Sequence, residues 1–160
     1  MIKIRSNEIK MVELRSLKMK SNNRNHHGQD QIEMLAEHYK YQGFRNPLIV
    51  SNQSGEIVSG NGRYLAAVRA GLKTLPVIFQ DFDSPEQEYS YHVADNSLHD
   101  WSRLDLSSIN NDLQDLGPDF DLKMLGINNF TLDFNQLDFN PNAEEKEKKS
   151  KICPHCGETI

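Results

Sequence analysis

The sequence predicts an α/β (α+β) domain in which helices pack on a small mixed sheet. Apolar segments of strand length alternate with longer segments of helical spacing, and glycine or asparagine turns separate them. The 160 residues, 26% charged and 37% hydrophobic, suffice for one domain and an appendage. No apolar run approaches the length of a membrane span, and the N-terminus lacks the apolar core of a signal peptide. We therefore expect a cytoplasmic protein without a membrane partner.

Three strands and one helix are expected before residue 60. Apolar residues alternate in the first strand segment, and the helix has apolar residues at spacings of three and four. The expected elements are a strand within 9–17, a polar loop over 21–28, a helix over 29–41, and strands 47–50 and 57–58 joined by a turn over 52–55. The last two strands form a hairpin that leads into the next helix.

The corner after this hairpin is the first candidate site. Gly60 and Gly62 allow positive φ and a close backbone approach, and Arg63 enters the first turn of a helix expected over 63–70. Unpaired N–H groups and the helix dipole favour an anion there. Gly60, Asn61, Gly62 and Arg63 are therefore candidates for a phosphate cradle. The alternative is a plain strand-to-helix corner with an exposed arginine.

The second half of the chain continues with one strand and two helices. Residues 74–79 read as a strand, in which Pro76 indicates an edge position or a strand start. Ser84, Pro85 and Gln87 have the residue types and spacing of a helix N-terminus, so a helix is expected to about residue 97. A second helix is expected over 105–116, closed by the Gly-Pro pair 117–118, with one or two further turns in 120–125.

The C-terminal segment differs in composition from the rest. Residues 142–151 form a charge run without aromatic residues, and Cys153 and Cys156 flank a Pro-His pair. We expect a domain over 1–130, a flexible linker over 131–151 in a disordered tail, and a cysteine knuckle over 152–160. Such a knuckle supplies half of a zinc site. A second chain completes the site, a partner supplies the other ligands, or the tail carries no metal.

Charge is distributed unevenly, although the net charge is only −5. Residues 1–24 carry seven basic side chains against two acids, whereas residues 81–121 carry eleven acids against one arginine. The basic stretch is a candidate surface for DNA, whose binding would weaken steeply with salt. Ordinary solvated surface is the alternative.

The order of these motifs resembles the ParB/sulfiredoxin superfamily, also called ParB-like nuclease domains. Residues 57–63 resemble a common IVAGHGR pattern, and residues 93–98 resemble ADNKL. The resemblance extends over about residues 8–130. It is nearest to the domains of phages and mobile elements that stand alone or precede a DNA-adenine methyltransferase, and it implies a bacterial or phage-infected host cell.

The resemblance implies a pocket for a nucleoside triphosphate with Mg²⁺. Residues 60–63 align with the Gly-Glu-Arg-Arg phosphate motif of ParB proteins and the Gly-Cys-His-Arg motif of sulfiredoxins. Asp95 and Asn96 align with a Glu-Asn pair near the metal and phosphates, and carboxylate and amide oxygens suit Mg²⁺. Asn61 replaces a catalytic Glu or Cys, and an amide is neither a general base nor a nucleophile. This pocket is expected to bind more than to react.

Two further arginines and two histidines are weighed for this pocket. Arg24 lies in the polar loop where the family has a basic residue, and Arg45 precedes the Asn-Pro of the second motif. Both are predicted to contact phosphate, with solvation or a surface ion pair as the alternative. His26 and His27 have no acid or cysteine at ligand spacing, so exposed loop histidines are expected.

The function predicted from the sequence is that of a nucleotide-binding accessory protein of a phage or mobile element. It would act in partition, modification or transcription control through DNA, a protein partner or a second copy. One alternative is a Mg²⁺-dependent enzyme, either a nuclease or a small-molecule kinase, with Asp95 and a second acid (Asp81, Asp83 or Asp100) holding the metal. The other alternative is a catalytically silent scaffold.

Overall fold

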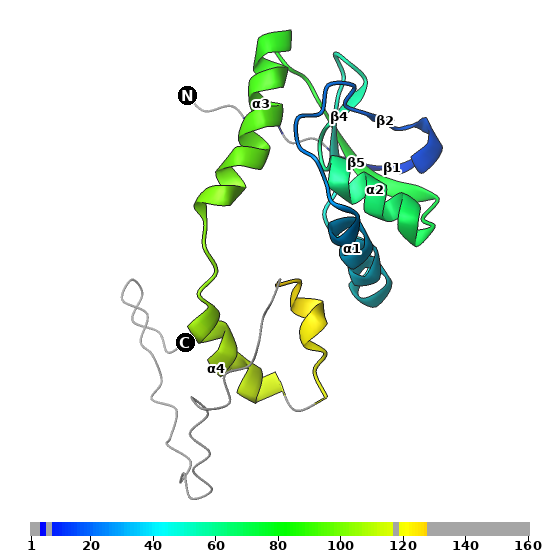
Figure 1. The fold of residues 1–160 in the computed structure, drawn as a ribbon. Coiled ribbons are helices and arrows are strands. Elements are labelled where there is room, and N and C mark those ends of the chain that lie inside the picture. Colours follow the sequence, from blue (N-terminus) through cyan, green and yellow to red (C-terminus); the bar gives the residue numbers. More distant parts are fainter. Residues whose placement is uncertain (1–3, 6–7, 117–118, 128–160) are drawn as a thin grey trace, which may run out of the picture.

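A five-stranded sheet forms the centre of the molecule (Figure 1). The structure is a computed structural model and describes residues 4–5, 8–116 and 119–127. The strands are β1 (Ile9–Glu13), β2 (Lys18–Met19), β3 (Leu48–Ser51), β4 (Glu56–Ser59) and β5 (Thr74–Gln80). Their order in the sheet is β1-β5-β3-β4-β2. The predicted α/β class with a small mixed sheet is confirmed.

Parallel and antiparallel pairs alternate across the sheet. β1 pairs with β5, and β3 with β4, in antiparallel fashion, whereas β3–β5 and β2–β4 are parallel. β5 is thus an inner strand, and the prediction that Pro76 marks an edge holds only locally. Pro76 pairs with Met11 of β1, but the β3 ladder begins one residue later, at Val77. At Pro76 the strand has a neighbour on one side only, where a missing N–H is tolerated.

The helices agree closely with the predicted positions. They are α1 (Gln29–Gln42), α2 (Asn61–Ala70), α3 (Pro85–Ser97) and α4 (Leu106–Leu116), and the 3₁₀ turns are η1 (Leu14–Ser16), η2 (Leu98–Trp101) and η3 (Leu122–Leu125). The strand predicted within 9–17 is confirmed as β1, but it is shorter than the predicted range, because η1 follows Glu13 and a separate β2 comes after it. The predicted cap of α3 is confirmed, since Ser84 Oγ accepts a hydrogen bond from Gln87 N at 3.2 Å.

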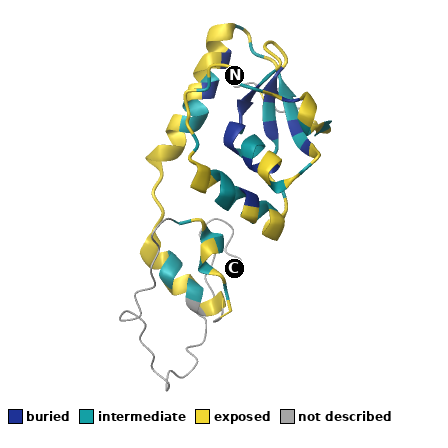
Figure 2. Cartoon of the chain, turned by 45° about the vertical axis from the view of Figure 1, so that its right-hand side comes forward, coloured by how far each residue is buried: buried dark blue, intermediate teal, exposed yellow. Residues whose placement is uncertain are grey.

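The hydrophobic core lies between the sheet and the pair α1 and α2, which pack side by side on it (Figure 1). Its buried members come mostly from the three inner strands: Leu17, Leu48, Val50, Ile57, Ala67, Leu75 and Val77. Figure 2 shows these strands as the most buried part, whereas α3 and α4 are largely exposed. The strand-to-helix corner is therefore built on the most rigid part of the fold.

α3 packs on the sheet through polar side chains. Its buried residues are Glu88 and His92, whereas Tyr89 and Val93 on its other side are exposed. His92 Nδ1 lies 2.8 Å from the carbonyl oxygen of Val58 in β4. Hydrogen bonds, more than apolar area, hold this helix in place.

The predicted helix end at 117–118, the linker over 131–151 and the knuckle with Cys153 and Cys156 lie outside the described residues. The zinc and linker assignments therefore stay predictions. None of the helices in the described part of the chain is long and apolar enough to cross a membrane.

Candidate functional site

A cleft of about 340 Å³ opens at the corner between β4 and α2. Gly60, at φ 98°, caps α2, and the first helical bond joins Tyr64 N to Gly60 O at 2.9 Å. The amides of residues 61–63 consequently have no partner within the helix. The cleft is lined by the corner 60–63, by Gln31 and Leu35 of α1, by the loop residues Asn23, Asn25 and His27, and by the α3–η2 residues Asp95, Asn96, His99 and Asp100. Polar side chains from several elements thus surround the N-terminus of α2.

Arg63 lines this cleft, but its guanidinium bonds mainly to the protein itself. One terminal nitrogen, Nη1, donates to the carbonyls of Asn46 (3.1 Å) and Pro47 (2.8 Å). The other, Nη2, donates to Ser59 Oγ at 3.1 Å. Arg63 therefore joins α2 to the start of β3. A phosphate would have to share this group with three acceptors.

The side chain of Asn61 is buried beneath the corner. Its Oδ1 accepts a hydrogen bond from Lys20 N at 3.1 Å, and its Nδ2 donates to Ile57 O at 3.1 Å. An amide suits this position because it donates and accepts at once. Asn61 thus fixes the polar loop to β4, and only its backbone N–H belongs to the row of open amides.

Asp95 and Asn96, the predicted Mg²⁺ ligands, face the same cleft from α3. Asp95 Oδ2 accepts from Ser59 Oγ at 2.7 Å. Asn96 bonds to Asn25 Nδ2 and to the carbonyl of His92, both at 2.8 Å. In the described ranges, no three His, Cys, Asp or Glu side chains are grouped to hold a metal ion. Asp95 is the acid best placed to meet a cation that a ligand brings with it.

His27 is a cleft residue that the sequence reading missed. Whereas His26 is exposed as expected, His27 is half-buried, and its ring lies against Gly62. A Cβ at residue 62 would lie 2.7 Å from the ring. Gln31 Oε1, one turn into α1, lies 3.1 Å from His27 Nδ1. Its place just before a helix was the available signal, but the contact with Gly62 depends on the packing of α1 against α2.

A larger cavity of about 930 Å³ adjoins the cleft, and Arg63 lines both. It lies between α1, the α1–β3 connection and the end of η3, and Arg45 lines it with Nε bonded to Gln42 O at 3.0 Å. The buried Tyr39 hydroxyl in its wall has no hydrogen-bond partner among the described residues, and burial raises the pKa of Tyr39. Arg24 is exposed and lines neither cavity.

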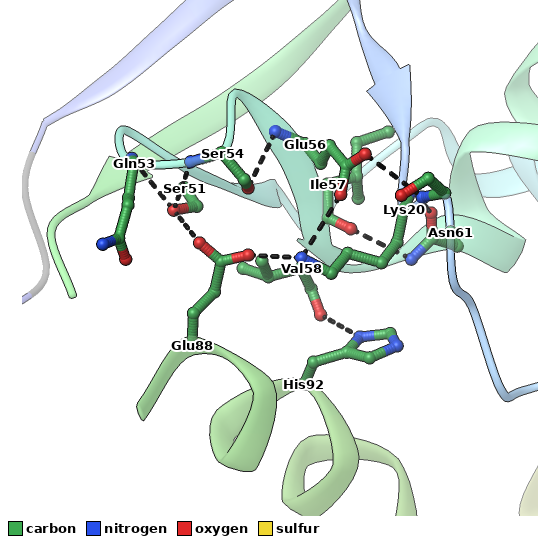
Figure 3. Close-up of polar contacts among 11 residues, drawn as sticks. Lys20, Ser51, Gln53, Ser54, Glu56, Ile57, Val58, Asn61, Glu88 and His92 are labelled. Atoms are coloured by element: carbon green, nitrogen blue, oxygen red, sulfur yellow. Dashed lines mark hydrogen bonds and ion pairs between the residues drawn. The ribbon is translucent and has the colours of Figure 1, made fainter. Parts of the chain in front are cut away.

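A cluster of charged residues lies beside the cleft (Figure 3). The Lys20 ammonium pairs with Glu88 of α3 and, at 3.2 Å, with Glu56 of β4. Ser51 Oγ donates to the other Glu88 oxygen at 2.5 Å. Burial alone would raise the pKa of Glu88 and Glu56, but the hydrogen bonds they receive outweigh it, so both pKa values are lowered. Burial works to lower the pKa of Lys20, yet its carboxylate partners raise it overall.

Comparison with known proteins places this geometry in a family. A curated relative, the "ParB-like nuclease domain-containing protein YnaK" of Escherichia coli (strain K12), is 32% identical over 75 residues, which cover 47% of this chain and 85% of that protein. The structure of Caulobacter crescentus ParB "complexed with CTP-gamma-S" aligns with a TM-score of 0.60 at 22% identity. That alignment covers 69% of this chain and 63%, less than two thirds, of the ParB chain.

A second solved structure agrees on the fold. The Pnob8-like ParB-N domain aligns with a TM-score of 0.50 at 18% identity, over 72% of this chain and 49% of that chain. The predicted fold of the ParB/sulfiredoxin type is therefore confirmed. A family model described as the ParB N-terminal domain matches residues 2–96, more than half of the sequence. With that match, the chain belongs to the ParB N-terminal domain family.

Proposed function

We propose that this protein is a nucleotide-binding domain that holds a triphosphate in the cleft at the α2 N-terminus. The observation that carries the proposal is the helix N-terminus at residues 61–63, whose amides have no partner within the helix and whose residues line a cleft together with polar side chains of the loop and α3. Such a helix end favours phosphate through its N–H groups and its dipole. The CTP analogue in the Caulobacter ParB structure supports a triphosphate ligand.

The charges around the cleft favour a triphosphate that arrives with Mg²⁺. Arg63 is the arginine of the cleft wall, and three protein acceptors already engage it. Asp95 and Asp100 line the same space and would repel a bare triphosphate. A divalent cation between Asp95 and the phosphates removes that repulsion, and oxygen ligands of this kind suit Mg²⁺.

The larger cavity is the natural place for the nucleoside. It continues from the cleft past Arg63 and is lined by polar side chains, among them Gln31, Gln42 and Arg45. Such donors and acceptors suit the hydrogen-bonding edges of a base. CTP is our first candidate because of the relative's ligand, and ATP and GTP are the comparisons.

The wider role follows from the family and stays a proposal. We propose an accessory protein of a phage or mobile element that acts in partition, modification or transcription control through DNA or protein partners. The basic N-terminal stretch offers less free charge than its sequence suggests. Its members Arg5, Lys10, Arg15 and Lys20 all form ion pairs with acids. A DNA contact would therefore depend on Lys18 and Arg24 more than on the others.

A nuclease is the second candidate, favoured by the printed name of the E. coli relative. Its metal would have to lie in the cleft, where Asp95 and Asp100 are the acids. Asp81 and Asp83 precede α3 and do not line it. A helix rises about 1.5 Å per residue, so the start of α3 at Pro85, which Asp83 precedes, lies about 15 Å from Asp95. Asp95 and Asp100 are the acids among the residues that line the cleft, and no group of three metal-ligating side chains occurs in the described residues, so binding is the better-supported function.

Calorimetric titration of the full chain with CTP, ATP and GTP, with and without Mg²⁺, tests the proposal. We expect one nucleotide to bind with Mg²⁺ and more weakly without it. Asp95→Asn keeps an acceptor for Ser59 but removes the charge, so it should weaken binding with Mg²⁺ and strengthen it without. Asp112→Asn on the exposed side of α4 is the matched control. No binding of any nucleotide refutes the proposal and leaves the scaffold, whereas turnover abolished by Asp95→Asn supports the enzyme.

A further inference from the structure

The loop wall and the helical wall of the cleft share one largely buried ion pair. The loop wall, residues 20–28, begins at Lys20, and the helical wall, α3, carries Glu88 two turns before Asp95. We infer that Lys20 and Glu88 are positioning residues that set the loop wall and α3 at a fixed distance. Neither is among the residues that line the cleft. The inference extends the proposed nucleotide site, but the ion pair can be tested without a nucleotide.

On the loop side, Lys20 is fixed at both its backbone and its side chain. Its N–H donates to buried Asn61 at 3.1 Å, and its ammonium lies between Glu88 and Glu56, 13% exposed (Figure 3). The next residues depend on this anchor, because Asn23 N bonds to Lys20 O at 3.2 Å and Asn25 N bonds to Asn23 Oδ1 at 3.1 Å. Displacement of Lys20 would therefore displace Asn23 and Asn25 in the cleft wall.

On the α3 side, Glu88 is the most deeply placed acid of the described helix. Its side chain is 5% exposed and accepts hydrogen bonds from Lys20 and from Ser51 at 2.5 Å. A carboxylate can be buried only if its charge is compensated, and Lys20 supplies that compensation. Because Asp95 and Asn96 follow in the same helix, the position of Glu88 along the sheet determines where they meet the loop.

A second tie between the two walls is too exposed to replace this pair. Asn25 Nδ2 donates to Asn96 Oδ1 at 2.8 Å near the cleft mouth, where water competes for both amides. The buried pair has no such competition. The ion pair should therefore dominate the placement of the loop, and Asn25→Ala should have the smaller effect.

Hydrogen exchange of the full chain tests the ion pair directly. Glu88→Gln keeps the shape of the side chain but removes the charge, and Lys20→Met removes the partner. Both should accelerate exchange of the amides of Lys20, Asn23 and Asn25, although Glu88 lies on a different element. Exchange in β5 should stay at the wild-type rate. Lys20→Arg should restore slow loop exchange, and Lys10→Met, which breaks the exposed pair with Glu8, is the matched control.

Titration of the same variants with CTP and Mg²⁺ tests the consequence for the cleft. A residue that orients ligand-binding groups typically costs about tenfold in affinity when it is replaced. We expect that loss for Glu88→Gln and no change for Lys10→Met. If the wild-type protein binds no nucleotide, the proposed function fails. The hydrogen-exchange measurement still tests whether the Lys20–Glu88 pair positions the loop.

Two results would overturn the inference. In the first, Glu88→Gln leaves the loop amides at the wild-type exchange rate, which means that α3 does not control the loop. In the second, exchange accelerates equally in β5, which means that the pair contributes only to global stability. If Lys20→Met does not fold, comparison of Glu88→Gln with Lys20→Arg still shows how loop exchange changes when the ion pair is lost or kept.

Discussion

The hydroxyl of Ser59, at the last position of β4, donates a hydrogen bond to the Asp95 carboxylate of α3 over 2.7 Å. The same oxygen accepts a hydrogen bond from Arg63 at 3.1 Å. One buried hydroxyl thus lies between the cleft's arginine and its acid and separates their charges. Without it, the two groups would be free to pair directly.

Removal of this hydroxyl should affect both fold and cleft. In Ser59→Ala, Arg63 and Asp95 each lose a partner in a half-buried site, so the free energy of unfolding should fall by about 1–2 kcal/mol. Nucleotide binding should weaken as well, because Asp95 and Arg63 are then free to pair with each other instead of with the ligand. Urea denaturation and calorimetry measure the two effects. Ser90→Ala, on the exposed side of α3, should change neither, and an equal loss in both variants would contradict the assigned role.

Asn61 should be required for folding more than for ligand contact. Asn61→Ala leaves the Lys20 N–H and the Ile57 carbonyl without their partners in a buried position. We expect the free energy of unfolding to fall by about 2–4 kcal/mol, the sum of two unsatisfied groups. Asn52→Ala removes an exposed asparagine bonded to Asp81 and should cost about 0.5 kcal/mol or less. Urea unfolding of both variants provides the comparison. Similar losses of unfolding free energy would show that the hydrogen bonds of Asn61 to Lys20 and Ile57 do not stabilise the fold.

Gly60 and Gly71 allow backbone strain to be separated from steric overlap. Both have positive φ, 98° and 78°, but a Cβ at Gly60 would lie 2.6 Å from Leu48 Cδ2, whereas nothing lies within 4 Å of one at Gly71. Gly71→Ala should cost about 1 kcal/mol from strain alone. Gly60→Ala should cost about 2–4 kcal/mol, because buried Leu48 must also move. Thermal and urea unfolding test the difference, and equal costs would mean that Leu48 adapts freely.

The cluster of Lys20, Glu56 and Glu88 should make the free energy of unfolding depend on pH. Burial acts to raise the pKa values of Glu88 and Glu56 in the folded protein. The hydrogen bonds from Lys20, Ser51 and Ser21 outweigh this effect, so both pKa values are lowered. Their contribution is therefore present at neutral pH and is lost as pH falls through the lowered pKa values. The raised pKa of Lys20 acts at the alkaline end, where its contribution disappears as pH rises through that value.

Urea denaturation from neutral pH to about pH 3, below the ordinary carboxylate range, measures this dependence. The free energy of unfolding of the wild type should fall more steeply than that of Glu88→Gln, which has one titrating group less in the cluster. Parallel curves would show that Glu88 is not stabilised as a carboxylate.

The parts of the fold that follow local rules could be predicted from the sequence. The hydrophobic period predicted β1, β3, β4, β5 and α1, but not the two-residue β2, and Ser84 with Gln87 predicted the start of α3. The strand-to-helix corner was also predicted, because Gly60 allows the positive φ that the turn requires. Its binding of phosphate stays a prediction. Each of these signals is contained in a short stretch of sequence, because secondary-structure propensity and helix capping depend on residues that are close along the chain.

The parts that the sequence did not reveal depend on contacts between distant residues. The role of Asn61 required the Lys20 backbone, forty-one positions away. Nothing in the sequence distinguishes the side chain of Ser59, and its importance appears only when α3 brings Asp95 to it. Arg24 shows the opposite case: its charge in a polar loop indicated a phosphate contact, but the loop carries Asn25 and His27, and not Arg24, into the cleft.

The polar inner face of α3 also has a consequence for how sequence change can act on this protein. An apolar interface accepts many substitutions of similar volume, because packing has no fixed partners. Glu88, His92 and Asp95 each bond to particular atoms of the sheet or its loop. A shift of α3 by a single residue would break all of these contacts at once. The residues of the inner face therefore fix the register of α3 on the sheet and should tolerate few substitutions. The residues of the outer face, such as Tyr89 and Val93, should tolerate many.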